Sequence, residues 1–223
     1  MTARDRILAK LRAAAPVQTS PSPDVAGYYG AHPLPPLAGR VAEFKAQLTA
    51  AHAEVVVADE ASWMHRLAEI IMVKAIRRLL ADWQGEAGRA LARALPAGIR
   101  MIEFDRPIEQ WKAELVEKGD AGFSVANAAV AATGTLVFAS GPDAPRTVSL
   151  VPPVHLALVR AETIYADMHS AAVGEAWAQA MPTNLIMVSG PSKTADIQQT
   201  LAYGAHGPKQ LVVVVVIPDG VRP

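Results

Sequence analysis

The run Leu211–Ile217 restricts the fold of this chain more than any other segment, because nearly all of its residues are β-branched. β-Branched side chains favour strands, and an apolar run without polar alternation is typical of a strand that is buried on both faces. Such strands occur in parallel sheets whose two faces are covered by helices. The run therefore predicts an α/β fold around a mostly parallel sheet.

The rest of the chain alternates between strand and helix patterns, as this fold class requires. Further apolar runs predict strands at 54–58, 98–104, 121–125, 134–139, 154–159 and 184–188. Apolar residues at helical spacing predict helices at 2–15, 37–51, 62–83, 109–118 and 161–180.

Proline marks the clearest boundary in the chain. The first predicted helix has Thr2 as its cap and Asp5 three residues later, a relative of the capping box. A linker rich in proline follows, from Pro16 to Pro36. We therefore expect a helical arm with its linker at 1–36 and one α/β domain at 37–223.

Composition excludes several classes of protein. The 223 residues carry no formal net charge, whereas a nucleic-acid-binding protein normally has a basic excess. The chain has no cysteine, so it has no disulfide, no cysteine nucleophile and no thiolates for an iron–sulfur cluster. No segment approaches the run of about 18 apolar residues that spans a membrane, and the N-terminus does not resemble a signal peptide. A cytoplasmic location is the simplest expectation.

Two motifs carry a resemblance to a known family. The first is SGPSKTADI at Ser189–Ile197, followed by GAHGP at Gly204–Pro208. The second runs from Ala131 to Phe138 and contains Thr-Gly-Thr, with Arg146 and the segment Ser149–Pro152 after it. Together they resemble the LUD (lactate utilization) domain family, which includes the lactate-utilization protein C group.

The resemblance implies a fold and a function. The fold is a Rossmann-like three-layer α/β/α sandwich, similar to CoA transferases, ribose-5-phosphate isomerase and 5-formyltetrahydrofolate cyclo-ligase. The function is that of a cluster-free component that acts with iron–sulfur partner proteins to oxidise L-lactate to pyruvate. One alternative is a stand-alone enzyme that binds a phosphorylated or carboxylated metabolite. Another is a non-catalytic assembly subunit. The residues do not decide whether the chain is catalytic, and its cofactor is unknown.

The turn at Ser189–Asp196 is the best candidate for a binding site. It lies between two predicted strands, and open α/β sheets bind ligands at strand ends. Ser192 stands where the N-cap of a short helix is predicted, and a helix N-terminus beside Lys193 would bind a carboxylate or a phosphate. The alternative is that Ser192 only caps that helix and that Lys193 is solvated.

His206 is the candidate catalytic residue, because its small and rigid neighbours would hold the ring in place. It would bind an anion or transfer a proton near neutral pH, or else it is structural. Asp196 would orient Lys193 or His206, or it is only a first-turn helix acid.

The turn at Gly134 is expected to let a ligand approach the backbone, and Arg146 would clamp a carboxylate. We expect this turn to meet the Ser189–Asp196 turn in space. The alternatives are a simple turn and an uninvolved loop arginine. The complete set of expected ligand-binding residues is Thr133, Gly134, Thr135, Arg146, Gly190, Ser192, Lys193, Thr194, Asp196, His206 and Gly207.

Two positions depart from the family pattern, which usually has Asp near 127 and Glu at 132. Asn127 and Ala132 remove both carboxylates, so acid–base or covalent carboxylate chemistry has no support at these points. The histidines show no metal-binding spacing, so no metal site is expected. There is also no glycine-rich dinucleotide fingerprint and no P-loop.

Overall fold

The computed structural model describes residues 2–14, 21–104, 106, 108–110, 119–141, 144–195 and 201–222. The chain divides into two compact units, Met1–Pro33 and Leu34–Pro223. The first unit contains helices α1 (Ala3–Ala13) and α2 (Val25–Gly30), neither of which has a buried residue.

The capping box predicted for α1 is confirmed. The Asp5 backbone N–H donates to the Thr2 hydroxyl at 3.2 Å, and the Thr2 backbone N–H donates to the Asp5 carboxylate at 2.8 Å. The segment predicted as linker, in contrast, contains α2. Asp24 caps this helix by accepting a hydrogen bond from the Gly27 backbone N–H at 2.8 Å. An aspartate is a common N-cap residue, but the many prolines around it favoured the prediction of a linker.

The second unit is built around a six-stranded sheet with the order β1-β12-β7-β4-β2-β3, in which every neighbouring pair is parallel. Its strands are β1 (Glu54–Asp59), β2 (Arg78–Leu80), β3 (Arg100–Ile102), β4 (Ala121–Val125), β7 (Val154–Arg160) and β12 (Gln210–Ile217). The valine-rich run is β12, which lies between β1 and β7, and Leu211–Val216 are buried. The predicted α/β class with a parallel sheet is confirmed.

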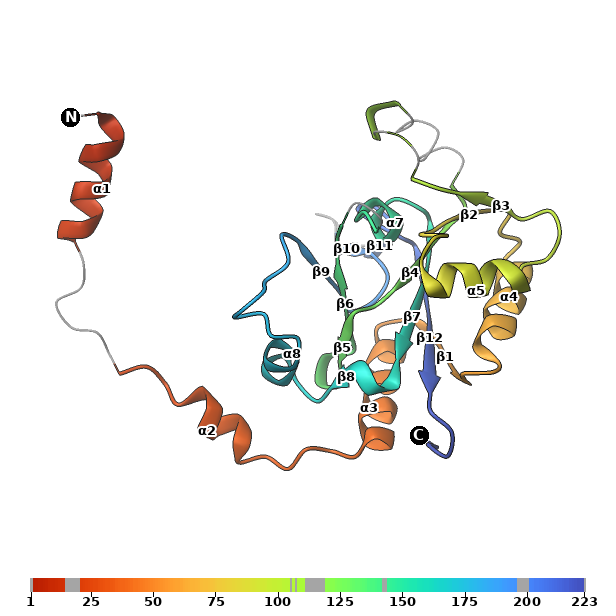
Figure 1. Ribbon diagram of the computed structural model, residues 1–223, viewed down its shortest axis with the longest axis horizontal. Coiled ribbons are helices and arrows are strands. Elements are labelled where there is room, and N and C mark those ends of the chain that lie inside the picture. The colour runs from red at the N-terminus through yellow and green to blue at the C-terminus, as the bar shows by residue number, and fades with distance from the viewer. Residues whose placement is uncertain are drawn as a thin grey trace. The chain divides into compact units, whose positions relative to one another are not determined.

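Helices cover both faces of this sheet (Figure 1). Helices α4 (Trp63–Val73) and α5 (Glu86–Ala94) pack on one face, where the core contains Val212, Val214, Leu156 and Leu158. Helix α3 (Leu37–Ala50) packs on the other face, over Val213, Val215, Ala157 and Val159. The alternating residues of the central strands thus supply two separate cores, as a strand with a period of two requires.

A second sheet, which the sequence did not predict as separate, shares the face covered by α3. Its strand order is β8-β5-β6-β9. These strands are β8 (Ile164–Tyr165), β5 (Ala128–Val130), β6 (Thr135–Ala139) and β9 (Leu185–Val188). Strand β9 runs antiparallel to β6. A third, two-stranded sheet pairs β10 (Lys193–Ala195) with β11 (Leu201–Tyr203), also antiparallel.

The long helix predicted at 62–83 is wrong, because α4 ends at Val73 and β2 follows it. Ala75 adopts the left-handed conformation, with φ of 53°. The Ile76 backbone N–H then donates to the Ile71 carbonyl at 3.0 Å, and the Ala75 N–H donates to Met72 at 3.0 Å. This is a Schellman motif, which normally uses glycine at the left-handed position. An alanine there gives no stop signal in the sequence.

The helix predicted at 161–180 is also wrong in extent. The segment contains the short turn η3 (Ala161–Thr163), then β8, and then α8 (Met168–Gly174), whose cap is Asp167. The predicted helix at 109–118 begins as a 3-10 turn, η1 (Ile108–Gln110), and the rest of it lies outside the described residues. Short helix α7 (Thr147–Leu150) precedes β7.

Candidate functional site

A cavity of about 390 Å³, here called the large cavity, opens at the carboxyl ends of the parallel strands. Four of these strands contribute lining residues at or just after their ends: Glu60 after β1, Asp82 after β2, Val125 in β4 and Arg160 in β7. The carboxyl ends of the strands are where open α/β sheets bind ligands. The apolar wall consists of Trp63, Met64, Phe123, Phe138, Leu158 and Ile186.

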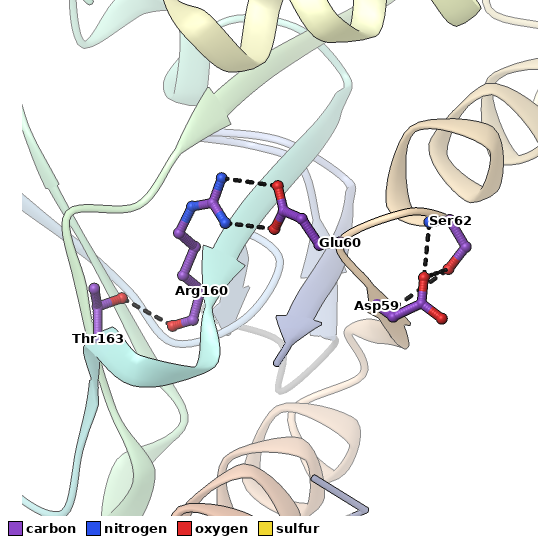
Figure 2. Close-up of polar contacts among 5 residues, drawn as sticks. All are labelled: Asp59, Glu60, Ser62, Arg160 and Thr163. Carbon is purple, nitrogen blue, oxygen red and sulfur yellow. Dashed lines mark hydrogen bonds and ion pairs between the residues drawn. The ribbon is translucent and has the colours of Figure 1, made fainter. Parts of the chain in front are cut away.

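An ion pair spans the rim of this cavity. Arg160 Nη1 donates to Glu60 Oε2 at 2.6 Å, and Arg160 Nη2 donates to Glu60 Oε1 at 3.3 Å (Figure 2). The hydrogen bond to Glu60 raises the pKa of Arg160 above its ordinary value. Because both side chains are substantially exposed, the pair contributes little to stability, and its main effect is to fix the two groups in space.

The turns that carry this pair are themselves held by short hydrogen bonds. Asp59, at the end of β1, accepts from the backbone N–H of Ser62 at 2.8 Å and from its hydroxyl at 2.5 Å (Figure 2). These bonds lower the pKa of the Asp59 carboxyl. The Thr163 hydroxyl donates to the Arg160 carbonyl at 2.9 Å. Both rim residues therefore project from fixed turns.

A smaller cavity, of about 180 Å³, lies at the amino ends of β7 and β12 and is here called the small cavity. It gathers much of the two sequence motifs. The lining residues are Ser149, Leu150, His155, Met187, Val188, Ser189, Gly190, Pro191, Ser192, His206, Gly207, Pro208 and Leu211. Ser149 lines both cavities.

His155 is a residue of the small cavity that sequence reasoning missed. It is 1% exposed, its Nε2 lies 3.1 Å from the Ser124 hydroxyl, and its ring packs against Phe138 with centroids 5.2 Å apart. Burial lowers its pKa to about 3, so the ring is neutral at physiological pH. Its Nδ1 is buried and has no hydrogen-bond partner among the described residues. In the sequence His155 is a single histidine within an apolar run, and this pattern does not indicate a binding site.

Two further polar side chains of the small cavity have no partner in the described part of the chain. These are the Ser192 hydroxyl and the His206 ring, both on segments that flank the cavity. The Ser192 backbone is fixed, because its N–H donates to the Pro208 carbonyl at 2.9 Å and its carbonyl accepts from the Gly204 N–H at 3.0 Å. The cavity thus presents hydrogen-bonding groups on a rigid frame.

The predicted meeting of the two turns is confirmed at Ser189. Its hydroxyl lies 2.7 Å from that of Thr135, which in turn lies 2.7 Å from that of Thr133. The result is a row of three hydroxyl groups from exposed Thr133 through buried Thr135 to the small cavity.

The helix predicted after Ser192 is wrong. Lys193 and Thr194 belong to strand β10, paired with Tyr203 and Ala202 of β11, so Ser192 is not a helix cap. The Lys193 side chain is exposed, and Asp196 lies outside the described residues. The apolar runs on either side suggested a strand–helix–strand unit, but the described residues between them include the antiparallel strands β10 and β11.

Gly134 has a different role from the one predicted. It is left-handed, with φ of 59°, and a Cβ placed on it would lie 2.8 Å from the Gln47 Cβ and 2.9 Å from the Leu48 N. The backbone therefore approaches α3, where the prediction expected a ligand. Gly190 likewise approaches Ala51 at the end of α3.

The predicted site residues also fall at two ends of the sheet. Ser192, His206 and Gly207 line the small cavity at the amino ends of β7 and β12, whereas Arg146 lines the large cavity at the carboxyl ends. The prediction placed Ser189–Asp196 at the ligand-binding end because it assumed that β9 belongs to the parallel sheet. The structure places β9 in the second sheet.

Asn127 and Ala132, which replace the family carboxylates, each form a hydrogen bond with the backbone of a neighbouring segment. The Asn127 side-chain carbonyl accepts from the Ala139 N–H at 2.7 Å, and this bond ties the turn before β5 to β6. Ala132 is exposed, and its N–H donates to the Ala166 carbonyl at 3.0 Å.

No helix in the described ranges is long and apolar enough to cross a membrane. Within the same part of the chain, no three His, Asp or Glu side chains gather closely enough to hold a metal ion.

Comparisons with known proteins agree with the fold. An uncharacterized protein of Neisseria meningitidis is 40% identical over 227 aligned residues, which cover 100% of this chain and 97% of that protein. Lactate utilization protein C of Oceanobacillus iheyensis is 31% identical over 51% of this chain and 50% of its own length. The corresponding protein of Halalkalibacterium halodurans is 33% identical over 46% of each chain. This chain therefore matches about half the length of these two named relatives.

A crystal structure of a DUF162 family protein from Deinococcus radiodurans superposes with a TM-score of 0.62 at 21% identity, over 82% of this chain and 99% of that one. This likeness supports the fold alone. The sequence pattern of the LUD domain matches residues 41–216, which include all the strands of the parallel sheet apart from the last residue of β12. The chain belongs to the LUD domain family.

Proposed function

We propose that this chain is a cluster-free component of a system that oxidises L-lactate to pyruvate together with iron–sulfur partner proteins, and that its small cavity binds the hydroxy acid. The similarity to lactate utilization protein C carries the first part of the proposal. With no cysteine in the chain, thiolate-bound clusters would reside in the partners.

The size and polarity of the small cavity support the second part. At about 180 Å³ it is smaller than the cavities that hold drug-sized ligands, which begin at about 300 Å³. Two groups of its lining residues have no partner in the described part of the chain and are accessible, Ser192 Oγ and the His206 ring, whereas His155 Nδ1 is unpaired but buried. Hydroxyl and imidazole groups are suited to the hydrogen bonds of a carboxylate and an α-hydroxyl. A small hydroxy acid matches this cavity in both volume and chemistry.

The partner claim is tested by reconstitution. The full chain is mixed with candidate iron–sulfur proteins from the same cell, and L-lactate-dependent reduction of an artificial electron acceptor is measured with and without it. We expect a stable complex and a rate that depends on this chain. A complex whose rate is unchanged without the chain would favour an assembly subunit. Lactate turnover by the isolated chain would favour a stand-alone enzyme.

The site claim is tested by calorimetric titration of L-lactate into three single variants. Ser192→Ala and His206→Ala should each weaken binding by roughly five- to tenfold, because each removes one hydrogen-bonding group worth about 1 kcal/mol. His65→Ala is the matched control, since His65 is exposed on α4 and lies outside the small cavity. Equal affinities in all three variants and the wild type would refute this site.

A further inference from the structure

The large cavity has a size and a location that the proposed lactate site does not use. Its volume of about 390 Å³ lies within the usual range for cavities that enclose a cofactor-sized molecule. It opens at the carboxyl ends of β1, β2, β4 and β7, the edge of an α/β sheet at which ligands bind. A hydroxy acid as small as lactate would leave most of this space empty.

The accessible walls of the large cavity favour an apolar group. Val125 at the end of β4 is 43% exposed, and Met64 of α4 and Ile186 of β9 are partly exposed. Trp63, Phe123 and Phe138 also line the cavity, but they are buried and add little accessible surface. A ring system placed against these aliphatic side chains would bury apolar area.

The other charged groups of the lining come from separate elements. Arg146, just before α7, is exposed and has no ion-pair partner among the residues that the structure describes. Asp82 and Glu86 belong to the segment between β2 and the first turn of α5. Glu60 is paired with Arg160, which also feels the charge of Glu86.

The cation and the two carboxylates select different chemical groups. A guanidinium with free N–H donors binds a phosphate or a carboxylate, with phosphate matching its fork geometry. Asp82 Oδ1 accepts hydrogen bonds from the backbone of Gln84 and Gly85, which leaves Oδ2 without a donor among the described residues. Carboxylate oxygens of this kind accept hydrogen bonds from the hydroxyls of a sugar.

From these three features together we propose that the large cavity is a mononucleotide site. The phosphate would be held by Arg146, the ribose hydroxyls by Asp82 and Glu86, and the base by the apolar wall at Val125, Met64 and Ile186. This site shares Ser149 with the proposed lactate site but none of the residues assigned to either ligand, so the failure of either proposal leaves the other standing.

The test is calorimetric titration of the full-length protein with AMP, GMP, CMP and UMP, each beside its nucleoside and beside inorganic phosphate. Arg146→Gln should weaken the best mononucleotide by roughly ten- to hundredfold and leave its nucleoside unchanged, because a charge-assisted contact is lost. Glu86→Gln should weaken mononucleotide and nucleoside alike. Arg93→Gln, on the last turn of α5 and outside the cavity, is the matched control.

The proposal predicts that the best mononucleotide binds at least tenfold more tightly than either its nucleoside or phosphate alone. It is overturned if no mononucleotide binds, if phosphate binds as well as the mononucleotide does, or if Arg146→Gln and Arg93→Gln have the same affinity. Circular dichroism of each variant confirms that the fold is retained. Should Arg146→Gln fail to fold, Arg146→Lys replaces it and should show a smaller loss of the same kind.

Discussion

At the scale of single residues, His155 is the clearest example of a side chain whose properties come from its surroundings. It is an unremarked histidine in the sequence, yet the fold buries it between Ser124 and Phe138 and lowers its pKa to about 3. The sequence could identify Ser192 and His206 as neighbours of a site through their turn motifs. It could not identify His155, because burial is a property of the assembled sheet.

Because His155 is buried as a neutral ring, we expect the stability of the fold to decrease at acidic pH. The folded-state pKa lies below the unfolded value of 6.5, so the stabilising contribution is present above pH 6.5 and is lost as pH falls toward 3. Between about pH 6.5 and pH 5 the wild type should lose about 2 kcal/mol of unfolding free energy to this group. Urea unfolding at several pH values measures this loss.

The comparison variant is His155→Phe, which keeps a ring in the core. Its unfolding free energy should change with pH less steeply than that of the wild type over the same interval, whatever its absolute stability. Parallel pH profiles for the two proteins would mean that His155 is not buried as a neutral group. Carboxyl groups with lowered pKa values, such as Asp59 and Asp120, titrate below this interval and do not obscure it.

At the scale of elements, three helices end on a left-handed residue other than glycine. These residues are His52 after α3, Ala75 after α4 and Ala176 after α8, with φ values of 68°, 53° and 53°. Sequence periodicity could place the helices and most strands, since those patterns are local. It could not end α4 or α8, because only the tertiary fold forces a non-glycine residue into this conformation.

Ala75→Gly should therefore raise the free energy of unfolding, by about 0.5–1 kcal/mol. The substitution removes the cost of the left-handed conformation, which exceeds the extra entropy of an unfolded glycine. Ala46→Gly, at an exposed position inside α3, is the matched control and should lower stability by about 1 kcal/mol. Chemical denaturation gives both values. If both variants are destabilised equally, the Schellman ending of α4 is wrong.

At the scale of the whole molecule, the parallel sheet separates two cavities at opposite strand ends. The direction and the sheet of each strand decide whether a motif lies at the amino or the carboxyl ends of the parallel strands. No local sequence pattern indicates that direction. This is why the prediction that grouped Arg146 with Ser192 and His206 was only partly right. The hydrophobic pattern was sufficient for the fold class, but the assignment of β9 to a second sheet required the structure.

The division of the chain into units predicts that the first one is dispensable for folding. Neither α1 nor α2 has a buried residue, so removing residues 1–33 takes no side chain from a core. A chain starting at Leu34 should unfold in one cooperative transition at the same temperature as the full-length protein. Calorimetry measures this, and a broad or strongly lowered transition would show that the first unit stabilises the α/β core.

The proposed function depends most on the binding of the hydroxy acid in the small cavity. A crystal structure of the full-length protein with saturating L-lactate tests it directly. Lactate should occupy the small cavity, with its oxygens within hydrogen-bonding distance of Ser192 Oγ or the His206 ring. Lactate bound elsewhere, or an empty small cavity at concentrations that saturate binding in solution, would contradict it.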